Sequence, residues 1–187
     1  MRAVAALAAL LFAITACSRV SGPVEIAAED LPFDVTRTEE PAASQVTARS
    51  YALFFVEGDR LDEVQREVEA DERPVVAVLR ALIDGPSSEE RELGVSTQVP
   101  AEVRLLEARV TSGTALVDVS GEFQEPAAPD AIALRVAQVV WTLTDLEGVD
   151  AVAFSIDGES VAVTTGDGAA VSRRVSRQDY SEFSPAG

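Results

Sequence analysis

The chain has 187 residues, which is enough for one domain with flanking segments. It carries 32 acidic and 15 basic residues, a formal net charge of −17, and no histidine. A surface this acidic repels the phosphates of nucleic acids and of anionic lipid headgroups. We therefore expect no nucleic-acid partner, and we expect the domain to stand off the membrane rather than lie on it.

The first residues predict a secretory signal peptide over residues 1–16. Arg2 precedes an uninterrupted apolar run over residues 3–14. Because a membrane-spanning helix needs about 20 apolar residues, this run is too short for a transmembrane anchor.

The end of the apolar run, Ile14-Thr15-Ala16-Cys17, resembles the lipobox of bacterial lipoproteins. The resemblance implies that the thiol of Cys17 is alkylated with a diacylglyceryl group, and two acyl chains hold a protein stably on a bilayer. Membrane lipid is therefore the expected partner of Cys17, at the extracytoplasmic face of the cell membrane. Cys17 is the only cysteine, which excludes an internal disulfide. An ordinary signal peptide with an incidental cysteine, or a cysteine buried in the core, is the alternative.

Residues 17–49 contain few large apolar side chains and no sustained period, which predicts a disordered tether. Regular structure is expected from Tyr51 onward. Two strands are predicted at residues 51–56 and 61–68. A helix then begins at Pro74, and Gly85-Pro86 ends it because proline cannot continue a helix.

The second half of the domain repeats this pattern. After a polar connection over residues 87–102, strands are predicted at 103–111 and 114–119, joined by Ser112-Gly113. A loop over 121–129 leads to a helix with Asp130 as N-cap, apolar residues at 3.6 spacing up to Leu146, and Gly148 as its end. A last hairpin over 149–156 and 159–163 turns at Asp157-Gly158.

The order ββα-ββα-ββ predicts an α+β domain over residues 50–165. The economical arrangement is two layers, with two helices packed on a mostly hairpin-built sheet. Residues 166–187 are predicted to be a polar and mostly loose C-terminal tail, in which Tyr180 and Phe183 could dock.

Several segments in the same order resemble the GerMN domain, an extracytoplasmic domain of the sporulation and spore-germination type. These segments are 51–56, 78–86, 89–94 with Val99-Pro100, 117–123, 134–144, and 148–154 with Asp157-Gly158. The resemblance implies a small fold of envelope lipoproteins and sporulation proteins that acts in binding or assembly. The chain shows a single copy of the pattern.

The residue types that most enzymes use are missing. Without histidine there is no Ser-His-Asp triad, and without lysine there is no Ser-Lys or Schiff-base chemistry. Zinc sites of the Cys/His kind are excluded for the same reason. We expect no catalytic residue, no cofactor and no metal site. A hydrolase that uses two carboxylates is the remaining enzymatic alternative.

The predicted function is a non-catalytic interaction module that binds an unidentified envelope protein. An exposed sheet edge, a helix face or a loop would provide the contact. The alternative is a lipoprotein that binds cell-wall glycan or a small molecule, although Trp141 is the only tryptophan available to such a site. Gln138, Trp141 and Thr142 could line an exposed face, but partial burial of the tryptophan is the interpretation we favour.

Overall fold

The computed structural model describes residues 48–69 and 73–185, within the compact unit Gln45–Gly187. The signal peptide, Cys17 and residues 17–47 of the predicted tether lie outside the described residues, whereas Ala48 and Arg49, also predicted to be tether, begin the first strand. The strands are β1 (Ala48–Glu57), β2 (Arg60–Glu69), β3 (Val95–Ser96), β4 (Leu105–Thr111), β5 (Thr114–Val119), β6 (Ala151–Ile156), β7 (Glu159–Ser160), β8 (Val163–Thr164) and β9 (Ala170–Val171). The helices are α1 (Pro74–Asp84), α2 (Ser88–Glu92) and α3 (Pro129–Leu143), with 3-10 turns η2 (Gly121–Gln124) and η3 (Arg177–Phe183).

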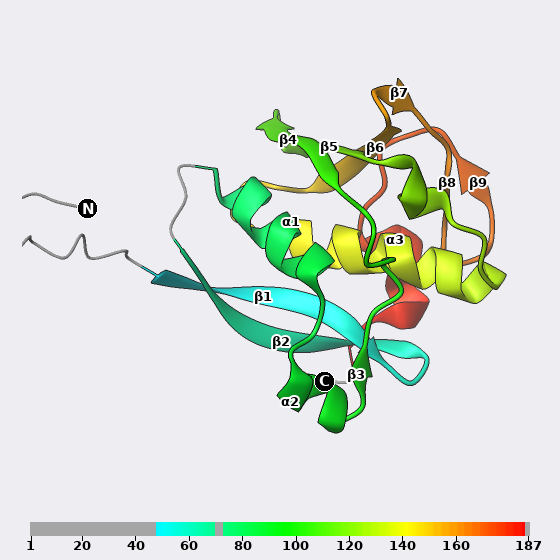
Figure 1. Ribbon diagram of the computed structural model, residues 1–187. Helices are drawn as coiled ribbons and strands as arrows, with labels where there is room; N and C mark the ends of the chain where they lie inside the picture. Colours follow the sequence, from blue (N-terminus) through cyan, green and yellow to red (C-terminus); the bar gives the residue numbers. More distant parts are fainter. Residues whose placement is uncertain (1–47, 70–72, 186–187) are drawn as a thin grey trace, which may run out of the picture. The chain divides into compact units, whose positions relative to one another are not determined.

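The predicted α+β class is confirmed, but the strands divide among three sheets instead of one. Their orders are β2-β1-β3, β4-β5-β6-β7 and β8-β9. Helices α1 and α3 pack side by side between the first two sheets (Figure 1). The expected single helix layer on one sheet is therefore replaced by two sheets that enclose the helices.

This enclosure explains the composition of α3. Residues 133–140 are all buried, whereas a helix lying on one sheet buries only one stripe. Helix α1 keeps the ordinary amphipathic pattern, with Val75, Val76, Val78, Leu79 and Leu82 buried. The 3.6-residue spacing thus located α3 correctly and understated how completely it is covered.

Both predicted two-residue hairpin turns are confirmed. Ser112 and Gly113 have φ values of 49° and 75°, and Asp157 and Gly158 have 49° and 83°. Positive φ at both central residues is the geometry that matches the twist of two antiparallel strands. The last hairpin is shorter than expected, since the segment after the turn divides into β7 and β8 in different sheets.

Strands β5 and β6 pair in parallel, from Thr114 opposite Ala151 to Val119 opposite Ile156. Parallel neighbours need a crossover connection, and η2 with α3 provides it. The predicted order of hairpins does not include this strand-helix-strand unit. Helix α3 lies against β6 on one side and β1 on the other because the crossover passes between the sheets.

The segment expected to be a polar connection contains regular structure. Ser87 caps α2 by accepting from the Glu90 backbone, while the Glu90 carboxylate accepts from the Ser87 backbone at 2.5 Å. Burial raises the pKa of Glu90, but these bonds and the Arg66 guanidinium at 2.6 Å lower it below its usual value. The following β3 pairs with Val56 and Glu57 at the end of β1.

Helix α3 differs from the prediction at both ends. Ala128 occupies the N-cap position and Pro129 the first turn, so Asp130 lies inside the helix instead of capping it. The helix ends at Leu143 with Thr144 as C-cap, before Leu146 and Gly148. Proline without a side-chain cap is sufficient here, because packing rather than capping holds this buried helix.

The prediction of a loose C-terminal tail is wrong. Tyr180 is fully buried, Phe183 is 8% exposed, and both belong to the hydrophobic core. The tail also pairs with β6 through reciprocal backbone bonds between Val152 and Val175 of 2.8 and 2.9 Å. Arg177 lies over the Trp141 ring at 4.7 Å and donates to the Trp141 carbonyl at 3.0 Å. The C-terminal segment is therefore part of the domain.

The variant Tyr180→Ala tests whether the tail stabilises the fold. We expect it to lower the free energy of unfolding by about 3–5 kcal/mol, as for other buried aromatic side chains replaced by alanine. Tyr180→Phe removes only the hydroxyl, which donates to the Thr164 carbonyl at 3.0 Å, and should cost about 1 kcal/mol. Urea unfolding of the full chain measures both. A Tyr180→Ala variant as stable as the parent would contradict the assignment of the tail to the core.

Candidate functional site

Three buried polar side chains lie along one face of α3. Arg135 is 4% exposed, and Gln138 and Thr142 are fully buried. Their spacing of three and four residues places them on the same side of the helix. We call these three residues the polar stripe. Since buried polar groups need hydrogen-bond partners, their contacts show what the stripe holds in place.

Gln138 and Thr142 bind the backbone of β1. The Phe54 amide donates to Thr142 Oγ1 at 3.0 Å, and Gln138 Nε2 donates to the Phe54 carbonyl at 3.3 Å. Gln138 Oε1 also accepts from the Gln98 amide at 2.8 Å. The alternative that Gln138 and Thr142 line an exposed face is therefore wrong.

Arg135 binds three carbonyl oxygens. Its Nε donates to Gln98 at 2.8 Å, and its Nη1 donates to Phe123 at 2.7 Å and to Glu125 at 2.9 Å. Burial lowers the pKa of Arg135, while the nearby Glu125 carboxylate opposes this shift. The effect of these bonds is to fix η2 against the first turns of α3.

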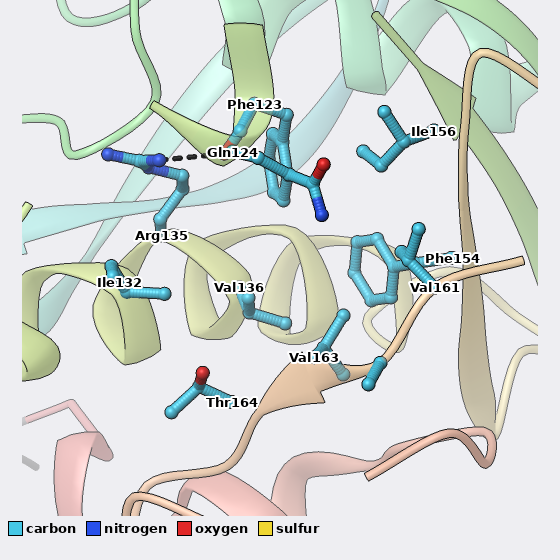
Figure 2. Close-up of a pocket in the computed structure, with 11 residues that line it drawn as sticks. Phe123, Gln124, Ile132, Arg135, Val136, Phe154, Ile156, Val161, Val163 and Thr164 are labelled. Atoms are coloured by element: carbon cyan, nitrogen blue, oxygen red, sulfur yellow. Dashed lines mark hydrogen bonds between the residues drawn. The ribbon is translucent and has the colours of Figure 1, made fainter. Parts of the chain in front are cut away.

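A cavity of about 210 Å³ lies where η2, α3, β6 and the segment around β8 meet (Figure 2). Its lining is mainly apolar, with Phe123 and Phe154 stacked at 6.0 Å between ring centroids. Val136 lines the cavity from α3, and Val163 lines it from β8. The sequence alone does not indicate this cavity, because its walls are far apart in the sequence.

A second surface feature is the edge of β4. Among the described residues, the exposed large hydrophobic side chains are Leu93 at 78%, Leu106 at 46% and Val110 at 43%. Leu93 stands at the end of α2, whereas Leu106 and Val110 lie on either side of the buried Ala108 in one strand. Exposed apolar residues on an open strand edge are typical of an interaction surface.

The backbone of β4 is also available for pairing. In the described part of the chain, β4 pairs with β5 on one side and with no strand on the other. The register that pairs Thr111 with Thr114 across the two-residue turn directs the amide and carbonyl groups of Ala108 and Val110 outward. At the opposite edge of the fold, more than half of the residues of β2 carry a charge, which discourages strand addition there.

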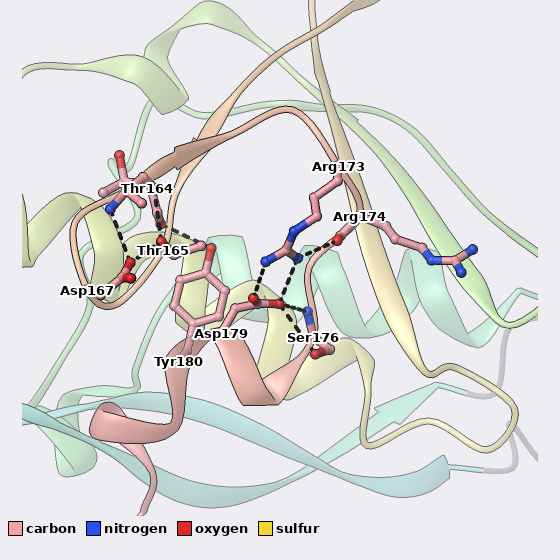
Figure 3. Close-up of polar contacts among 9 residues, drawn as sticks. Thr164, Thr165, Asp167, Arg173, Arg174, Ser176, Asp179 and Tyr180 are labelled. Carbon is pink, nitrogen blue, oxygen red and sulfur yellow. Dashed lines mark hydrogen bonds and ion pairs between the residues drawn. The ribbon is translucent and has the colours of Figure 1, made fainter.

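The ionisable groups near the C-terminal segment form a local network (Figure 3). Arg173 Nη2 lies 2.5 Å from Asp179 Oδ1, and this hydrogen bond lowers the pKa of Asp179. The hydroxyl of Thr165 similarly lowers the pKa of Asp167, and burial raises the pKa of Tyr180. Each of these carboxylates is stabilised in its charged form, which is the opposite of what a general acid requires.

In the described residues, no group of three or more His, Cys, Asp and Glu side chains is placed to hold a metal ion. A helix with the length and hydropathy needed to cross a membrane was not found over residues 48–69 and 73–185.

The fold defines the class of the protein, an α+β domain in which two sheets enclose two helices. The family model of Germane, described as sporulation and spore germination, matches residues 52–162. The chain belongs to this family, which confirms the resemblance to the GerMN domain. A comparison with curated proteins found no match.

Two solved structures of the sporulation protein GerM from Bacillus subtilis share this fold. The tandem GerMN domains are 23% identical with a TM-score of 0.57, over 71% of this chain and 48% of that chain. The first GerMN domain alone is 25% identical with a TM-score of 0.52, over 70% of this chain and 98% of that chain. The chain thus spans about half the length of the tandem structure.

The variant Gln138→Leu tests the polar stripe. It leaves the Phe54 carbonyl and the Gln98 amide without a buried partner, so we expect a loss of about 2–4 kcal/mol in the free energy of unfolding. Gln178→Leu, at an exposed position of η3, is the matched control and should change stability by less than about 0.5 kcal/mol. Equal stability of the two variants in urea would show that the stripe does not hold β1.

Proposed function

We propose that the protein is a lipid-anchored module at the extracytoplasmic face of the cell membrane that binds an envelope protein without catalysing a reaction. The observation that carries this proposal is the open edge of β4, where outward backbone groups lie between the exposed side chains of Leu106 and Val110. A partner that adds a strand there gains main-chain hydrogen bonds and apolar contacts together. Membership of a sporulation-related family supports an envelope role.

The chemistry of the chain supports binding over catalysis. Histidine and lysine are absent from the whole sequence, and the carboxyl groups with a shifted pKa are shifted downward. The negative charge of −17 favours a partner with a basic surface, because complementary charge increases the rate of association.

The cavity provides the observation that favours a second candidate, a lipoprotein that binds a small molecule. Its volume of about 210 Å³ lies below the ~300–1,000 Å³ of most ligand pockets. Its lining is mainly apolar, and of its polar residues Arg135 already binds carbonyl oxygens of the chain through Nε and Nη1. We therefore place the interaction module first.

Site-specific crosslinking tests the β4 edge. Benzoylphenylalanine replaces Leu106, and the full chain is irradiated in intact cells of its source organism. We expect one discrete adduct, and we expect Val110→Lys to abolish it because a charge at the edge opposes strand addition. Gln65, exposed on β2, is the matched control position. No adduct from position 106, or equal adducts from positions 106 and 65, would overturn the proposed docking edge.

The anchor is tested separately with Cys17→Ser. Loss of the thiol removes both acyl chains, so the protein should move from the membrane fraction to the soluble extracytoplasmic fraction. Mass spectrometry of the mature N-terminus of the parent should show a diacylglyceryl group on Cys17. A free thiol at Cys17, or unchanged membrane association of the variant, would contradict lipid anchoring.

A further inference from the structure

The size of the cavity beside α3 limits what it can hold. An apolar cavity of about 150 Å³ accommodates one benzene ring, and this cavity measures about 210 Å³. It is therefore large enough for a single aromatic or branched aliphatic group and too small for a disaccharide or a cofactor. A pocket of this size in a binding surface typically receives one anchoring side chain of a partner.

The polar groups of the cavity also argue for a side chain on a polypeptide. The Nε and Nη1 donors of Arg135 bind carbonyl oxygens of the chain itself, so these two atoms are not free to bind a ligand. Gln124 is exposed, and its amide lies beside Phe154 and Ile156 in the cavity (Figure 2). An amide in this place can donate to and accept from the backbone of an entering peptide, while the cavity takes its side chain.

Several exposed residues close in sequence to the cavity lining are acidic, and Arg135 is the cation within the lining. Glu122 and Glu125 flank the lining residues Phe123 and Gln124, while Asp157 follows the lining residue Ile156 in the β6–β7 turn and Glu159 follows the turn. All four are exposed, and Arg104 is the cation whose charge reaches Glu122. An apolar cavity with this surrounding charge complements an apolar residue that has basic neighbours.

We propose that this cavity receives one aromatic or branched aliphatic side chain of a partner protein, from a segment in which arginine or lysine stands next to that residue. The inference rests on the proposed function and names the chemistry of the partner segment. Strands β5 and β6 connect the cavity to the β4 edge within one sheet, so a single partner could contact both.

Peptide titration of the full chain, with its methyl groups labelled for NMR, tests the proposal. The probes are acetyl-Arg-Phe-Arg-amide and acetyl-Glu-Phe-Glu-amide. We expect saturable shifts of the Val136, Val161 and Val163 methyl groups, with binding of the arginine peptide about threefold tighter at low salt. The difference should disappear at high salt, where exposed charges are screened.

Variants separate the cavity from the rest of the surface. Ala162→Trp places a large ring at an exposed lining residue and should abolish the methyl shifts. If this variant does not fold, Val161→Phe at the neighbouring lining residue narrows the cavity instead. Ala101→Trp, at an exposed position outside the cavity, should bind like the parent. Binding that persists in both cavity variants, or that is equal for the two peptides, would overturn the proposal.

Other occupants would give different results. Saturable shifts with lauric acid but not with the peptides would assign the cavity to an acyl chain, and shifts that depend on protein concentration alone would assign it to a second copy. Both outcomes overturn the proposal. If the peptides do not bind while the adduct at position 106 forms, the cavity inference fails and the proposed function stands. If the peptides bind but no adduct forms at position 106, the docking edge fails and the cavity inference stands.

Discussion

The fold depends on how α3 satisfies the backbone of its neighbours. Strand β1 has β2 on one side, but on the other side β3 pairs only with its end. The Phe54 amide and carbonyl would therefore be buried without partners, at a cost of about 1–3 kcal/mol each. Gln138 and Thr142 supply the missing partners. A helix thus takes the place of a neighbouring strand along the middle of β1.

The same constraint positions the candidate site. Arg135, the first residue of the polar stripe, binds the Phe123 and Glu125 carbonyls and so holds η2 over the start of α3. Phe123 and Gln124 then form one wall of the cavity, and Val136 forms another. The cavity is therefore built on a fixed wall, which reduces the ordering cost of binding a partner side chain. The polar stripe therefore bonds to the first sheet at Phe54 and also holds the wall of the cavity that η2 forms.

The sequence predicted the features that local chemistry determines. Positive φ values are needed at the turns Ser112-Gly113 and Asp157-Gly158 and at Gly85, where α1 ends. The residue types at these positions, glycine above all, favour such values locally. The parallel pairing of β5 with β6 and the docking of Tyr180 depend on contacts between distant segments, which local periodicity does not contain. The cavity was missed for the same reason, and an exposed sheet edge was expected without being located at β4. One local signal was overlooked, since Ser87 and Glu90 have the spacing of a capping box.

The two larger sheets differ in what their edges expose. The edge of the first sheet at β2 is charged, which opposes pairing with another chain. On the other side of β1, the Phe54 amide is already bonded to Thr142 of α3 and is not available for such pairing. The second sheet exposes Leu106 and Val110 on β4, where a bulge interrupts the pairing between Leu105 and Glu107, and it borders the cavity through Phe154 and Ile156 of β6. Since an edge strand with exposed apolar side chains is a risk for aggregation, the proposed docking of a partner at β4 would explain why these side chains are kept in a fold whose β2 edge is charged.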